Sequence, residues 1–204
     1  MATGQRMFVA LTPSPEAVED LQELLDPRRA AEPDLRWTDP EQWHVTLAFL
    51  AQVPDQALDD LVERLARAAR RRAPFTAALR GGGAFPHSDR ARVLFAGVDA
   101  GDQQPALRHL AQSARAAANR AGAAPDGARF HPHVTVARAG RPTNLVRWVR
   151  LLDPYAGPLW PVAELHLIAS HLGEGPRRRP RYEVVASLPF ASDASEASDA
   201  SDRA

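Results

Sequence analysis

The feature that most constrains the fold is a short motif that occurs twice in the chain. Residues 43–50 read WHVTLAFL and residues 132–138 read PHVTVAR, so His-Val-Thr-apolar-Ala begins once at His44 and again at His133. The two copies keep the same register although the sequences around them differ. This repetition indicates a chain that folds into two similar halves, each of which contributes one copy.

Each copy is expected to form a β-strand with two different faces. Successive side chains of a strand point to opposite sides, so residues two apart share a face. His44 and Thr46 should therefore lie on one face of the first strand, and His133 and Thr135 on one face of the second. If a pseudo-twofold axis relates the halves, the two pairs converge on one cleft. The apolar residues should face the other way: Val45, Leu47 and Phe49 in the first copy, Val134 and Val136 in the second.

Helical and extended patterns alternate along most of the chain. Ser14 and Pro15 are typical of a helix start, and Thr143 is expected to cap a short helix. The patterns predict strands at 6–12, 43–50, 74–80, 91–98, 132–138, 162–170 and 181–188, helices at 14–25, 55–72, 105–121 and 143–152, and a loop at 81–89.

This order predicts an α+β fold. We expect two similar lobes of antiparallel-rich sheet with flanking helices, related by a pseudo-twofold axis, and a cleft between the lobes. Residues 1–190 should form this single domain, with strands shared across the halves. Residues 191–204, ASDASEASDASDRA, are an acidic low-complexity tail that we expect to be disordered, although an interaction tail is the alternative.

Composition excludes several kinds of chemistry. The 204 residues include no Cys, and all 25 basic residues are Arg because the chain has no Lys. Disulfides, thiolate catalysis, Cys-ligated zinc and lysine Schiff bases are therefore impossible. The net charge is zero, but the acidic tail leaves the body mildly positive, which would not repel an anionic substrate. No apolar run reaches the roughly 18–20 residues that span a bilayer, and no secretory signal is evident, so a cytoplasmic monomer is expected.

Two imidazoles that face one cleft suit the cleavage of a phosphate ester. A neutral His can take a proton from the attacking water, and a protonated His can give one to the leaving oxygen. Both states are accessible near neutral pH because the unperturbed pKa is about 6.5. The hydroxyls of Thr46 and Thr135 could donate hydrogen bonds to phosphoryl oxygens. One His-x-Thr is most often an ordinary structural feature, but its repetition favours a site.

A metal site is an alternative interpretation of the second copy. His131 and His133 share a strand face there, and His44 could complete a set of three ligands. However, Gln42 stands where the first copy would need the counterpart of His131, and the set offers no carboxylate. We therefore disfavour this alternative.

The chain resembles the two-histidine (2H) phosphoesterase superfamily, whose hallmark is a pair of His-x-Thr-x motifs. Within it, the chain is most similar to the bacterial RNA 2′,3′-cyclic phosphodiesterases, also called 2′-5′ RNA ligases. The similar segments are RMFVALTPS, LRWTDPEQWHVTLAFL, FHPHVTVAR and AELHLIASHLGEGPRRRPRYEVVASLPF, and the resemblance covers about residues 5–190. Ala51 departs from the family's usual Gly, and Val136 from its commoner Leu.

The resemblance implies a role for each matching residue. His44 would be the proton donor, His133 the proton acceptor, and Thr46 and Thr135 would hold the phosphate. Arg138 matches the family's trailing Arg and could pair with phosphate or nucleotide, although strict alternation places it on the face opposite His133 unless the strand bulges. The implied reaction is hydrolysis of a terminal 2′,3′-cyclic phosphate to a 2′-phosphate, with weak reverse 2′-5′ ligation.

The resemblance also bears on cofactors and partners. No cofactor, metal or nucleotide triphosphate would be required, and the substrates would be RNA ends or small cyclic nucleotides. A phosphodiesterase for another cyclic or 2′-5′-linked nucleotide remains an alternative, as does a non-catalytic RNA-binding module.

Several further residues could contact RNA, but each has a simpler interpretation. Trp37, Phe85 and Phe130 could stack on a base, although aromatic residues more often belong to the core. The arginine-rich run at 177–181 could follow an RNA backbone or be a solvated loop. His87 could contact substrate from a loop. The remaining histidines, His109, His166 and His171, are expected to be structural.

Overall fold

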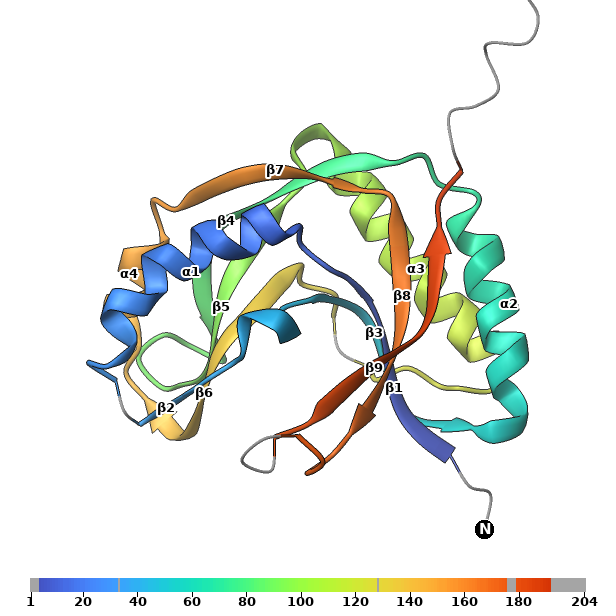
Figure 1. Cartoon of the computed structure of the whole chain (residues 1–204), viewed down its shortest axis with the longest axis horizontal. Helices are drawn as coiled ribbons and strands as arrows, with labels where there is room; N and C mark the ends of the chain where they lie inside the picture. The colour runs from blue at the N-terminus through green and yellow to red at the C-terminus, as the bar shows by residue number, and fades with distance from the viewer. Residues whose placement is uncertain (1–3, 33, 128, 176–178, 192–204) are drawn as a thin grey trace, which may run out of the picture.

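One curved antiparallel sheet runs through the molecule (Figure 1). The computed structural model describes residues 4–32, 34–127, 129–175 and 179–191, and within them the sheet has nine strands. Their order is β7-β4-β5-β6-β3-β1-β8-β9, and β2 also pairs with β6. The strands are β1 (Gly4–Leu11), β2 (Leu35–Trp37), β3 (Val45–Pro54), β4 (Phe75–Phe85), β5 (Ala91–Asp99), β6 (His133–Thr143), β7 (Ala156–Val162), β8 (Glu164–His171) and β9 (Arg181–Pro189).

The sheet divides into two similar halves between β3 and β6. One half runs outward in the order β3-β1-β8-β9, and the other in the order β6-β5-β4-β7. The halves join where Val45 of β3 pairs with Val134 of β6, and we call this contact the seam. Each copy of the repeated motif thus forms the innermost strand of its half. The predicted α+β fold with two similar halves is confirmed, and the lobes are two parts of a single sheet.

The helices cover the sheet across the two halves. They are α1 (Pro15–Arg29), α2 (Leu58–Ala69), α3 (Gln104–Arg120) and α4 (Val146–Leu152), with short 3₁₀ turns η1 (Pro40–Gln42), η2 (Asp55–Ala57) and η3 (Gly101–Gln103). Helix α1 follows β1 but packs against β7 and β4, and α3 follows β5 but packs against β3 and α2. Helix α1 begins as predicted, since the Ser14 side chain accepts a hydrogen bond from the Ala17 N–H. None of the described helices is long and apolar enough to cross a membrane.

Some predicted element boundaries are wrong. The glycines at 81–83 belong to β4 rather than to a loop, because Gly82 and Gly83 pair with β5. Gly81, with a positive φ of 62°, lies at the register shift between Leu79 and Gly82. Thr143 ends β6, and α4 has Leu145 at its N-cap position instead. Strands β2 and β7 were not predicted at all. Residues 192–204 lie outside the described residues, so the disordered tail stays a prediction.

The seam is held from behind by buried apolar side chains. Val45, Leu47, Val134 and Val136 are each at most 1 % exposed and belong to the main hydrophobic core. This apolar face is the one that the sequence predicts for both copies of the motif. The opposite face of the seam is therefore free to carry polar side chains.

Gly97 provides a test of the close packing behind the second motif. It pairs with His133, and a Cβ at this position would lie 2.6 Å from the backbone oxygen of Arg80. Backbone cannot move aside cheaply, so Gly97→Ala should lower the free energy of unfolding by about 1–3 kcal/mol. Gly140→Ala is the matched control, because a Cβ there meets nothing within 4 Å. Urea denaturation of both variants would measure the difference, and equal stabilities would contradict the packing described here.

Candidate active site

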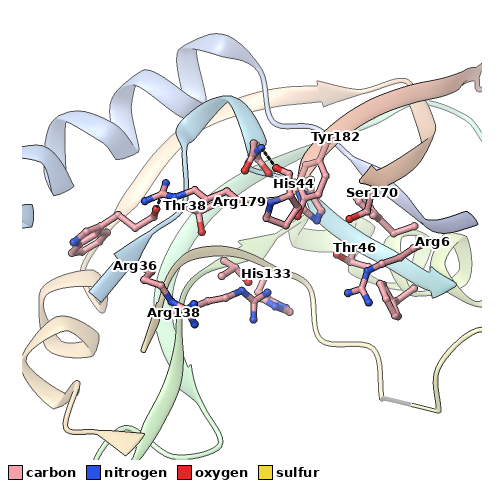
Figure 2. A pocket seen from close by; sticks show the side chains of 16 residues that line it. Arg6, Arg36, Thr38, His44, Thr46, His133, Arg138, Ser170, Arg179 and Tyr182 are labelled. Carbon is pink, nitrogen blue, oxygen red and sulfur yellow. Dashed lines mark hydrogen bonds between the residues drawn. The ribbon is translucent and has the colours of Figure 1, made fainter. Parts of the chain in front are cut away.

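A cleft of ≈650 Å³ opens on the polar face of the seam (Figure 2). Both His–Thr pairs of the repeated motif lie in it, which confirms that the two motifs converge. Its walls come from β1, β2, β3, β6, β8, β9 and the segments next to them. The lining residues are Arg6, Phe8, Arg36, Trp37, Thr38, Gln42, His44, Thr46, Phe49, His133, Thr135, Arg138, Ser170, Arg179, Pro180 and Tyr182.

The seam sets the positions of the four motif side chains. In the antiparallel register, Val45 pairs with Val134. His44 and Thr46 flank Val45, and His133 and Thr135 flank Val134, and all four side chains line the cleft. The seam therefore brings the reactive groups of both copies to one region of the cleft.

The two histidines are held by identical backbone contacts. The Nδ1 atom of His44 lies 2.7 Å from the carbonyl oxygen of Gln42, and Nδ1 of His133 lies 2.7 Å from the carbonyl oxygen of His131. A carbonyl oxygen can only accept, so each Nδ1 carries a proton and donates it. This fixes the tautomer and the ring orientation, and it leaves Nε2 of each ring free to accept or donate a proton.

A β-bulge follows the Thr in each copy of the motif. In β3, Thr46 pairs with Ala10 and Ala48 with Val9, so Leu47 is the extra residue. In β6, Thr135 pairs with Phe95 and Ala137 with Leu94, so Val136 is the extra residue. A bulge of one residue reverses the alternation of the side chains that follow it.

The bulges overturn two expectations based on strict alternation. Arg138 lines the cleft rather than the opposite face, because the bulge at Val136 returns it to the side of His133. Phe49, expected on the core face, also lines the cleft because of the bulge at Leu47. Phe49 and Arg138 occupy matching places in the two copies. The two copies of the motif therefore differ at this place, since one presents an aromatic ring, over which the Arg6 guanidinium lies at 4.3 Å, and the other presents a cation.

Aromatic rings surround His44. The ring of Phe8 stacks on it with centroids 4.4 Å apart. The ring of Tyr182 packs against it edge-on, with centroids 5.5 Å apart. Burial is the main cause that lowers the pKa of His44 to about 4, with smaller contributions from the positive charge of His133 and Arg138. The Gln42 carbonyl opposes this shift. His44 is therefore neutral at pH 7 in the free protein.

The second histidine has a similar environment. The ring centroids of Phe85 and Phe95 lie 5.2 and 5.1 Å from the ring centroid of His133. Burial lowers the pKa of His133, and nearby His131 and Arg138 lower it further, while the His131 carbonyl raises it. Both imidazoles consequently prefer the neutral form until an anion enters the cleft.

The charge of the cleft is positive. Four arginines line it, namely Arg6, Arg36, Arg138 and Arg179 (Figure 2). No Asp or Glu is among the lining residues in the part of the chain that the structure describes. Such a cleft attracts anions and favours protonation of a histidine once a phosphate is bound.

The other residues considered from the sequence fall into two groups. Trp37 lines the cleft, and so does Arg179 from the arginine-rich run, whereas residues 177–178 lie outside the described residues. Arg181 of the same run pairs instead with Glu174 and Glu183. The cleft lining does not include Phe85, Phe130, His87, His109, His131, His166 or His171.

The histidines outside the cleft have other contacts. His166 is buried between the hydroxyls of Thr12 and Ser187, and His171 lies 3.2 Å from the carboxylate of Glu183. Within the described ranges, no three His, Cys, Asp or Glu side chains are grouped as a metal site would require.

Sequence reasoning missed several lining residues. Arg6 and Phe8 come from β1, and Ser170 and Tyr182 come from β8 and β9. These strands reach the cleft only because β1 pairs with β3 and β8 with β1. The available signal was the Ser and the Tyr in the closing segment, which took part in the family resemblance but received no role.

The comparison with family models decides the relationship of the chain. The model described as LigT like Phosphoesterase matches residues 11–95 and 98–177. The chain belongs to this LigT-like phosphoesterase family. The predicted membership of the 2H superfamily and the predicted enzyme class, a phosphoesterase, are thereby confirmed.

Curated relatives of this LigT-like chain carry a consistent name. An RNA 2′,3′-cyclic phosphodiesterase of Geobacillus stearothermophilus is 30% identical over 185 residues, which are 90% of this chain and 56% of the relative. One of Aeropyrum pernix is 35% identical over 158 residues, which are 75% of this chain and 87% of the relative. The chain thus spans just over half the length of the Geobacillus protein.

Solved structures agree with the family assignment. The protein TT0787 of Thermus thermophilus superposes with a TM-score of 0.73 at 31% identity, covering 92% of this chain and 99% of that one. Escherichia coli LigT in apo form gives a TM-score of 0.74 at 25% identity, covering 94% and 100%. The same protein in complex with 3′-AMP gives 0.67 at 25% identity, with the same coverage.

The lowered histidine pKa values can be measured directly. Below its unperturbed pKa of about 6.5, a free His would be protonated. We expect His44 to stay neutral on acidification until about pH 4, and His133 to titrate below 6.5. Added inorganic phosphate should raise both midpoints, because an opposite charge favours imidazolium. Imidazole ¹H–¹⁵N correlation spectra across a pH series would report both midpoints. A His44 midpoint at or above 6.5 would contradict this account of the site.

Proposed function

We propose that the protein is a metal-independent phosphodiesterase that hydrolyses 2′,3′-cyclic phosphates at RNA ends or on nucleotides, giving 2′-phosphates. The observation that carries the proposal is the pair of anchored imidazoles, which share one positive cleft with the threonines of both motifs. The names of the relatives and the binding of 3′-AMP by the E. coli protein support an RNA-type substrate.

In the proposed reaction, the cyclic phosphate sits between the two motifs. Nε2 of neutral His133 accepts a proton as the oxygen of a water molecule forms a bond to phosphorus. The bond from phosphorus to the 3′ oxygen breaks, and protonated His44 gives that oxygen its proton. The products are a 3′ hydroxyl and a 2′-phosphate, with one proton gained by His133 and one lost by His44. With a 5′-hydroxyl in place of water as the nucleophile, the same proton transfers would form a 2′-5′ phosphodiester and free the 3′ hydroxyl, which is the weak ligation that we include in the proposal.

The threonines and Arg138 act on charge rather than on protons. The hydroxyls of Thr46 and Thr135 donate to the non-bridging oxygens, where negative charge accumulates in the transition state. Arg138 is close enough to influence the pKa of both histidines, so its guanidinium also reaches the region of the phosphate. These groups stabilise the phosphoryl group, and the histidines move the protons.

The lowered pKa of His44 gives the bound phosphate a second part in this scheme. An acid with a pKa of about 4 is almost entirely deprotonated at neutral pH in the free enzyme. The negative phosphate between the histidines raises the pKa of both rings. The bound substrate therefore helps to protonate His44, the acid that acts on it.

The cytoplasmic location and the monomeric state expected from the sequence stay predictions.

The central test uses the protein in EDTA. His44→Ala and His133→Ala should each reduce hydrolysis of a 2′,3′-cyclic nucleotide by about 10²–10⁴-fold, the usual contribution of a general acid or base. His109→Ala, on the exposed face of α3, is the matched control and should keep full activity. Chromatography of the product should identify a 2′-phosphate. Activity abolished by the chelator, or unchanged in either motif variant, would refute the mechanism. A folded protein that binds RNA without any turnover would favour the non-catalytic alternative.

The pH dependence of kcat/KM offers an independent test. This parameter reports the ionisations of the free enzyme, and its bell-shaped maximum lies midway between the two apparent pKa values. Since burial lowers the pKa of both His44 and His133, the maximum should lie below pH 6.5. The profile of kcat should be displaced to higher pH, because bound phosphate raises both values. A kcat/KM profile that is flat from about pH 5 to 9, or that peaks above 7, would count against paired histidines.

A further inference from the structure

Two arginines face each other across neighbouring strands in the cleft. Arg36 of β2 and Arg138 of β6 are direct antiparallel partners, and both line the cleft. Like charges placed directly opposite each other destabilise a sheet. Neither side chain forms an ion pair with a carboxylate in the described part of the chain, and Asp34, two residues before Arg36, pairs with Arg141 instead. The repulsion between Arg36 and Arg138 destabilises the sheet locally, and a bound anion would reduce this repulsion.

The two arginines differ in their position relative to the histidines. Arg138 lies between Arg36 and His133 in the view of the cleft, and Arg36 is on the side away from the histidines (Figure 2). A phosphate held by the His–Thr pairs would engage Arg138 and leave Arg36 without an anionic partner.

Arg179 lies on the same side of the cleft as Arg36 (Figure 2). One of its terminal nitrogens donates to the carbonyl oxygen of Trp37, the residue after Arg36, at 2.9 Å. This hydrogen bond holds the guanidinium beside β2 and uses one of its five N–H donors. Gln42 donates to the carbonyl oxygen of Pro180 at 2.9 Å and fastens the same segment. Arg36 and Arg179 thus both line the cleft, with Arg179 fastened to the residue that follows Arg36.

We propose that Arg36 and Arg179 form a second phosphate subsite, which takes the phosphodiester on the 5′ side of the terminal nucleotide. The inference rests on the proposed function and refines it: the negative charge of the 5′ phosphodiester adds to the binding of the substrate at these two side chains. Guanidinium groups suit this task because they bind phosphate oxygens in a planar, often bidentate manner. The subsite contacts no base, so it adds affinity without base preference.

The experiment compares three substrates that differ only on the 5′ side. They are a nucleoside 2′,3′-cyclic phosphate, a dinucleotide that ends in the cyclic phosphate, and the same dinucleotide with a neutral methylphosphonate linkage. For the wild type, kcat/KM should be about tenfold higher for the charged dinucleotide than for the neutral one, as expected from one or two charge-assisted contacts. Arg36→Gln should bring this ratio close to one. Arg67→Gln, on the exposed side of α2, should keep the wild-type ratio.

The outcomes separate this proposal from the proposed function. Equal kcat/KM for the two dinucleotides in the wild type would overturn the subsite, while hydrolysis of the mononucleotide would still support the phosphodiesterase. A ratio unchanged in Arg36→Gln would also overturn it. If no substrate is hydrolysed, the proposed function fails, and calorimetric binding of the two dinucleotides decides the subsite. Equal affinities would then refute it, and preference for the charged linkage that disappears in Arg36→Gln would support it.

Discussion

The pairing of Val45 with Val134 joins the two halves of the sheet, and the positions of the polar groups in the cleft depend on it. A slip of one residue would move every side chain of a strand to the other face. The buried valines prevent such a slip, because it would expose them and bury the histidines. Apolar packing on one side of the seam thereby fixes hydrogen-bonding chemistry on the other. The backbone anchors at Gln42 and His131 then set the orientation of each ring.

Burial and a bound phosphate would act in opposite directions on the pKa of the two histidines. The aromatic walls, with Phe8 stacked on His44, keep the imidazoles neutral when the cleft holds no anion. The arginines make the same cleft favourable for a phosphate, whose charge reverses the preference of the rings. In the proposed reaction, protonation of the two imidazoles is thus linked to the presence of a phosphate in the cleft. Exposed histidines would show a weaker link, because an unperturbed imidazole with a pKa of about 6.5 already holds a proton part of the time near neutral pH without any bound anion.

The sequence was sufficient for the repeated strands, the α+β class and the four motif side chains, because these follow from a period of two and an internal repeat. The sequence was insufficient wherever a contact between distant segments determines which way a side chain points or which strands are neighbours. Alternation placed Phe49 and Arg138 wrongly because a bulge depends on the partner strand, Val9–Ala10 in one case and Leu94–Phe95 in the other. Arg6 and Tyr182 reach the cleft only through strand order. The short strand β2 has three residues, too few for a periodic signal.

The matching bulges have a consequence for the choice between two bonds. A 2′,3′-cyclic phosphate offers two ester oxygens that are nearly equivalent, and two histidines related by a twofold axis would treat them alike. The symmetry of the two copies ends after the bulge that follows each threonine. The next side chain that faces the cleft is Phe49 in one copy and Arg138 in the other. In the proposed reaction, discrimination between the two ester bonds would therefore come from residues outside the repeated motif. The duplication would supply the reactive groups, and the divergence between the copies would supply the regiochemistry.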